Sequence, residues 1–139
     1  MNTKDKLIFI ISFVITYYLL LLLGVYVFGN FLVRIEEQLI HLVLRNSVNY
    51  QAFDFVVYCS GIVSISAYLG VVIGFWIVNV KPKLKLVLAS AVVLLLVNIL
   101  RIIAVMLSEK IGVEELLHVA SWFLMGALII WLIKISYKK

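Results

Sequence analysis

The sequence has little charge and almost nothing that would separate two domains. Of its 139 residues, 14% are Asp, Glu, Lys or Arg, and one is proline. Soluble domains carry about 25% of such charged residues, so this composition excludes an ordinary soluble globular domain. No Pro-, Gly- or Ser-rich stretch and no internal repeat interrupts the chain. We therefore expect a single integral membrane domain over residues 1–139.

Cysteine is also scarce, because Cys59 is the only one in the chain. A single cysteine excludes an intramolecular disulfide and a cysteine-rich metal site. We expect neither a metal nor a cofactor. The thiol is then either a small apolar side chain in the packing or a reactive group.

What the chain does contain is long apolar runs. Hydrophobic residues make up 65% of it, and its mean hydropathy is +1.20. A transmembrane helix needs about 20 predominantly apolar residues. The runs predict an all-α polytopic membrane bundle with about four transmembrane helices, over residues 7–28, 53–80, 86–107 and 116–133. The first run exceeds a signal-peptide core of about 7–15 residues, so we interpret it as a retained span.

Residues 31–51 have a different pattern, in which charged residues and His41 occur among leucines and isoleucines at nearly helical spacing. This pattern predicts one amphipathic helix, which either continues the first span or lies at the membrane interface.

Two glycines four residues apart, Gly70 and Gly74, lie on one face of the second predicted span. Such a face lets a neighbouring helix approach closely. The candidates for that neighbour are residues 89–91 (Ala-Ser-Ala) in the third span and Gly126 in the fourth. The short link over residues 81–85 predicts an antiparallel hairpin of the second and third spans.

The formal net charge of +5 comes from basic residues beside apolar runs, with no aromatic-laced patch that would indicate nucleic-acid binding. Basic residues of short loops are retained on the cytoplasmic side. Eight of them fall on one side, against Arg34, Arg45 and Lys110 on the other: Lys4, Lys6, Lys81, Lys83, Lys85, Lys134, Lys138 and Lys139. Both termini are therefore predicted to be cytoplasmic.

This orientation places Cys59, Arg101 and His118 at a similar depth in the outer half of three successive spans. An arginine inside an apolar helix costs about 2.5–3.5 kcal/mol on insertion scales and needs polar partners. Asn98, three residues earlier, shares its helix face, and Glu114 or Glu115 could pair with it from the outer loop.

Each of these residues also has an ordinary interpretation. Arg101 can extend along its stem to the interface, Cys59 can be a packing residue, and His118 can be an interfacial histidine. His41 is a rival histidine of lower rank.

Together, however, the three residues have the composition of a cysteine acyl-transfer site. A thiolate is the nucleophile, a histidine accepts and returns the proton, and a fixed cation stabilises the oxyanion. Gly61 would let a substrate backbone approach, and Ser60 would add a hydroxyl donor. On the face of His118, Glu115 would orient the ring and Trp122 would form a wall beside it. Either could equally be an ordinary interfacial residue.

Three short motifs over about residues 56–130 resemble those of the exosortase/archaeosortase family of membrane transpeptidases. They are Cys59-Ser60-Gly61-Ile62, Asn98-Ile99-Leu100-Arg101-Ile102, and His118 within residues 115–122. The resemblance implies a minimal member in which Cys59 forms a thioacyl intermediate, His118 is the general acid and base, and Arg101 stabilises the oxyanion or holds the substrate.

Substrates implied by the resemblance are secreted proteins that end in a sorting motif, a transmembrane helix and a basic tail, with a membrane lipid as the acceptor. The implied location is the plasma membrane of a prokaryote, most readily an archaeon, with the site facing outward. Two alternatives remain open from the residues: a non-enzymatic transporter or assembly subunit with Arg101 and His118 as a polar site, and a cysteine protease that only hydrolyses its target.

Overall fold

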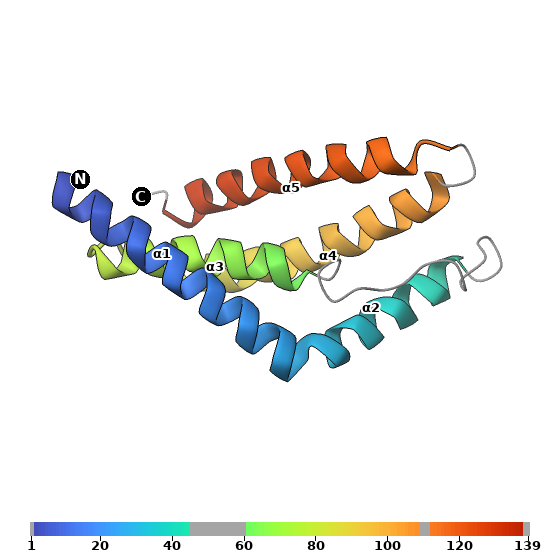
Figure 1. Cartoon of the computed structure of the whole chain (residues 1–139), viewed down its shortest axis with the longest axis horizontal. Helices are drawn as coiled ribbons and strands as arrows, with labels where there is room; N and C mark the ends of the chain where they lie inside the picture. Colours follow the sequence, from blue (N-terminus) through green and yellow to red (C-terminus); the bar gives the residue numbers. More distant parts are fainter. Residues whose placement is uncertain (1, 45–60, 109–111, 138–139) are drawn as a thin grey trace.

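A computed structural model describes residues 2–44, 61–108 and 112–137, and this part of the chain is helical without strands. The predicted all-α class is therefore confirmed. The elements are α1 (Thr3–Leu23), the π-helical turn η1 (Gly24–Phe28), α2 (Gly29–Leu44), α3 (Ile62–Ile77), α4 (Leu84–Ser108) and α5 (Glu114–Ser136) (Figure 1).

Three helical stretches in the described residues are long and apolar enough to cross a membrane: Thr3–Val27, Leu84–Ser108 and Glu114–Ser136. They coincide with the first, third and fourth predicted spans. The second predicted span begins outside the described residues, and its helix α3 has 16 residues, about 24 Å at 1.5 Å per residue. It ends at Ile77 and not at Val80, because Asn79 adopts a left-handed conformation with φ of 65°, which breaks the helix.

The first helix bends sharply where η1 interrupts it, and α2 continues from the bend in a new direction (Figure 1). A π-helical turn disturbs the regular ladder of hydrogen bonds and is a recognised cause of kinks. After the bend, Ile40 of α2 is fully buried among Ile99, Ile102 and Met106 of α4. The described part of the predicted amphipathic segment, residues 31–44, thus continues the first helix and packs along α4.

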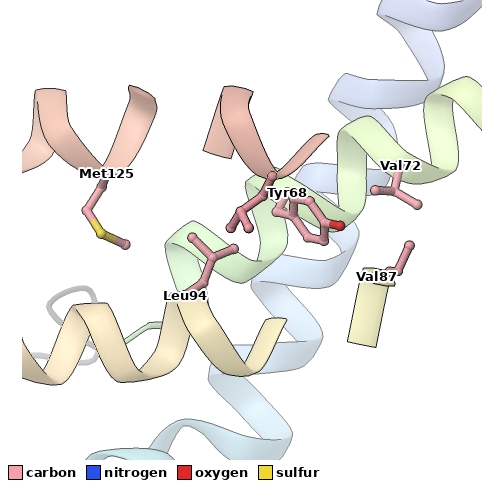
Figure 2. Close-up of a cluster of buried hydrophobic side chains, with 6 residues drawn as sticks. Tyr68, Val72, Val87, Leu94 and Met125 are labelled. Atoms are coloured by element: carbon pink, nitrogen blue, oxygen red, sulfur yellow. The ribbon is translucent and has the colours of Figure 1, made fainter. Parts of the chain in front are cut away.

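The centre of the bundle is α3, whose side chains meet α4 and α5 in one apolar cluster. Tyr68 and Val72 of α3 belong to this cluster together with Val87 and Leu94 of α4 and Met125 of α5 (Figure 2). Leu132 of α5 completes this buried cluster. Burying such side chains is the main favourable contribution to packing where water is the alternative, and dispersion contacts serve the same purpose in lipid.

The glycine face of α3 packs against α1, so both neighbours expected from the sequence were wrong. A Cβ added to Gly70 would lie 3.3 Å from the ring of Phe13, and one added to Gly74 would lie 3.1 Å from the ring of Phe9. Among the described residues, none comes within 4 Å of a Cβ added to Gly126. The glycines do permit a close approach, and the side chains that pack against them are aromatic residues of the first helix.

A polar network joins α3 to the ends of α4 and α5. The hydroxyls of Tyr68 and Ser136 lie 2.7 Å apart in the buried interior, and the backbone N–H of Lys83 donates to the Ser136 carbonyl at 3.1 Å. Tyr137 donates its hydroxyl to the Val72 carbonyl at 3.0 Å. Burial, and to a smaller extent the neighbouring Tyr68, raises the pKa of Tyr137 to about 12, which keeps the phenol available as a donor.

We expect Gly74→Leu to lower the free energy of unfolding by about 1–3 kcal/mol, because the new side chain would overlap Phe9 and push α1 away from α3. Reversible unfolding in mixed detergent micelles would measure this. Gly126→Leu is the matched control and should change stability little. Equal losses in the two variants would contradict the α1–α3 packing.

Tyr68→Phe should cost about 0.5–1.5 kcal/mol, because it removes one buried hydrogen bond and leaves the ring in place. The same unfolding measurement applies. Tyr18→Phe, at a side chain that is 59% exposed, should fall within about 0.5 kcal/mol of the wild type. A Tyr68→Phe protein as stable as the control would show that the contact with Ser136 contributes nothing.

Candidate functional site

Arg101 is buried between α4 and α5, with 7% of its surface exposed. Its Nη1 donates to Asn98 Oδ1 at 3.2 Å, and its Nε donates to Ser121 Oγ on α5 at 2.9 Å. The contact of Asn98 with Arg101 is the one that helical spacing predicted, and Asn98 is itself fully buried. The guanidinium is held inside the protein and does not extend along the surface to the interface.

His118 lies directly beside this arginine, on the second turn of α5. Its Nδ1 is 3.5 Å from Arg101 Nη2. Its Nε2 accepts a hydrogen bond from the indole Nε1 of Trp122 at 3.2 Å. The Trp122 ring also covers the guanidinium, with Arg101 Cζ 4.2 Å from the ring centroid, a cation–π contact. The structure therefore brings together two of the three residues expected to carry the chemistry.

Ser121 is the member of this cluster that the sequence analysis missed. Besides accepting from Arg101, its hydroxyl donates to the His118 carbonyl at 2.6 Å. It lies three residues after His118, so helical spacing placed it on the same face. That spacing was the available signal, but serine is too common in membrane helices for it to be selected without knowing which face of α5 meets α4.

Two hollows adjoin the pair. One, of about 400 Å³, is lined by His118 together with four neighbours: Val105, Glu114, Glu115 and Val119. The other, of about 530 Å³, is an apolar groove along α4 and α5 with Arg101 and Ser121 among its walls. The alanines Ala104 and Ala120 border this groove and leave room for it. A reactive group at this site would therefore have space on two sides.

The expected roles of the two glutamates change in the structure. Within the described residues, neither Glu114 nor Glu115 is among the side chains that contact the Arg101 guanidinium. Glu114 Oε2 is buried without a hydrogen-bond partner, and both carboxylates line the hollow beside His118. Glu115 was expected to orient the ring, but the two ring nitrogens instead face Arg101 of α4 and Trp122 of α5.

Several predicted residues fall outside the description. Cys59 and Ser60 lie in the segment 45–60, which is outside the described residues, and so does the side chain of the rival His41. Gly61 precedes the first residue of α3 as its N-cap and is buried. In the described ranges, no three His, Cys, Asp or Glu side chains gather in a way that would hold a metal ion.

Comparison of the chain with protein-family models, with curated protein sequences and with solved structures gave no match in any of the three.

We expect Ser121→Ala to lower the free energy of unfolding by about 1.5–3 kcal/mol, because a hydrogen bond from a buried cation loses its acceptor. Ser108→Ala is the matched control. Its hydroxyl is also buried and also donates to a carbonyl three residues earlier, that of Val105, but it is not a partner of Arg101. Unfolding in detergent gives the loss in free energy of unfolding for each variant, and the difference between the two losses measures the hydrogen bond between Ser121 and Arg101. Equal losses would show that this bond does not stabilise the protein.

Proposed function

We propose that this protein is a membrane-embedded cysteine transpeptidase that cleaves the C-terminal sorting signal of secreted surface proteins and transfers the new carboxyl end to an acceptor. The observation that supports it most is the contact of Arg101 with His118 inside an apolar bundle, next to open space. A buried cation beside a histidine is expensive in a membrane and is typical of a functional site.

The reaction assigns one task to each residue. Cys59 gives its thiol proton to His118, and the sulfur attacks the scissile carbonyl carbon to form a tetrahedral oxyanion, which Arg101 stabilises. The intermediate collapses to a thioester as the amine leaves with the proton from His118. An acceptor then gives a proton to His118 and attacks the thioester, and the thiol leaves with that proton.

The sequence distance between Cys59 and α3 supports this assignment. Cys59 precedes the first residue of α3, Ile62, by three positions. One turn into the helix, Ile65 packs against the cluster that contains Met125, together with Val97. Val97 and Met125 also line the groove at Arg101. One turn from its start, α3 therefore packs against a cluster that shares Met125 with the wall of the groove at Arg101.

The membrane arrangement that goes with this function has four spans, with α3 and the residues before it as the second. Both termini are cytoplasmic, and the pair faces the outer side of a prokaryotic plasma membrane, as in an archaeon. The resemblance of the three motifs to the exosortase/archaeosortase family supports this arrangement, as does the count of basic residues. The acceptor is a membrane lipid on the same resemblance.

A second function is favoured by how well the polar groups satisfy one another. Asn98, Ser121 and Trp122 already engage the pair, so the cluster would also serve as the fixed polar element of a non-enzymatic transporter or assembly subunit. This alternative gives no role to the thiol, which is where the two functions differ.

The test is the fate of a co-expressed substrate that carries a sorting motif, a transmembrane helix and a basic tail. Cys59→Ala and Cys59→Ser should abolish its processing while the folded protein remains in the membrane. Arg101→Lys should reduce processing at least about a hundredfold, because lysine lacks the planar fork of donors. Mass spectrometry of the substrate's C-terminus reads the product.

Processing that survives Cys59→Ala would exclude Cys59 as the nucleophile and with it the transpeptidase. A transporter or assembly function that is intact in Cys59→Ala, with no processing in either protein, would support the polar-site alternative. A new carboxyl end that is free and not lipid-linked would identify a protease instead.

A further inference from the structure

Both ring nitrogens of His118 face groups that can only donate. Trp122 Nε1 lies 3.2 Å from Nε2, and Arg101 Nη2 lies 3.5 Å from Nδ1. The indole nitrogen and the guanidinium have no acceptor atoms. A neutral imidazole has one lone pair to offer, on whichever nitrogen lacks the proton. Only one of these two donors can therefore be satisfied at a time.

Geometry decides which donor is satisfied. The Trp122 contact is close to the usual hydrogen-bond range, whereas 3.5 Å to Arg101 is at its outer limit. The indole N–H has one fixed direction, four residues along the same helix, and the two rings stand nearly perpendicular at 78°. The guanidinium, in contrast, has two further acceptors, because its Nη1 donates to Asn98 and its Nε donates to Ser121. When His118 turns a protonated nitrogen toward the guanidinium, the guanidinium keeps these other hydrogen bonds. The indole N–H would lose its acceptor if the protonated nitrogen faced Trp122 instead.

We propose that Trp122 is a positioning residue that selects the tautomer of His118: the proton resides on Nδ1, and the lone pair on Nε2 is held by the indole. Trp122 also makes a second contact, because its ring covers the guanidinium of Arg101. One side chain thus sets the orientation of both the histidine and the guanidinium.

For the reaction, which rests on the proposed function, this inference identifies Nε2 as the nitrogen that takes the thiol proton. At rest the indole N–H occupies that lone pair, and an incoming thiol must displace it. Because 37% of the Trp122 surface is exposed, the ring has room to move. The indole would then act as a reversible cap on the base.

The test uses nitrogen NMR of His118 in detergent micelles. The chain has two histidines, so His41→Gln leaves His118 as the only ring observed. The two nitrogens of a neutral imidazole ring have distinct resonances, which identify the nitrogen that carries the proton. We expect the proton on Nδ1, and in Trp122→Phe, which keeps an aromatic face over Arg101 but removes the N–H, a shift of the proton to Nε2.

Trp131→Phe is the matched control, because Trp131 is on the same helix and 57% exposed, and it should leave the tautomer unchanged. A wild-type spectrum with the proton on Nε2 would overturn the proposal, and so would a Trp122→Phe spectrum identical to the wild type. The wild-type measurement alone decides the assignment if Trp122→Phe does not fold.

These spectra need no substrate, so they remain informative if the chain proves not to be an enzyme. If the wild type processes substrate, Trp122→Phe should slow processing about tenfold or more, whereas Trp131→Phe should not. The reason is that the lone pair of His118 would then lie on Nδ1 and could not accept the thiol proton at Nε2. An unchanged rate with a shifted tautomer would remove the link to catalysis and overturn the role of Trp122 in the reaction.

Discussion

The cost of a guanidinium inside an apolar helix is the constraint on which the α4–α5 half of the structure depends. At about 2.5–3.5 kcal/mol on insertion scales, an arginine at such a position must find polar partners. In the part of the chain that the structure describes, Arg101 has one such partner on its own helix, Asn98, and others on α5. Because the α5 partners lie within one turn of each other, the arginine determines which face of α5 meets α4 and at which register.

The two ends of the α4–α5 pair are held by different means. Near the start of α5, a charged cluster joins the helices through Arg101, and near its end a neutral network joins Tyr68, Ser136 and Lys83. Between them lies the apolar cluster around α3 (Figure 2). In the neutral network, the two hydroxyls and the backbone N–H of Lys83 all take part in hydrogen bonds that join the helices. The charged cluster differs because it adjoins open space, which is why we propose it as the functional site.

Much of this arrangement was predictable from local patterns. Three of the predicted spans coincide with described apolar helices, because about 20 consecutive apolar residues have few alternatives to a helix in a membrane. The pairing of Asn98 with Arg101 followed from helical spacing. The partner of the glycine face did not, since Gly70 and Gly74 reveal that something approaches closely but not that it is Phe13 and Phe9. Ser121 was missed for the same reason, as its importance depends on a residue of another helix.

By itself, therefore, the sequence determined a helical membrane protein and the local faces on which its few polar residues lie, because both depend on composition and on a fixed rise and turn per residue. Only the tertiary structure decided which faces meet. It turned α2 back onto α4 at a π-helical turn, packed α1 on the glycines of α3, and placed donors on both nitrogens of His118. These outcomes depend on contacts between residues distant in the chain, and apolar helices in lipid have many nearly equivalent ways to pack until close approach and polar pairing select one.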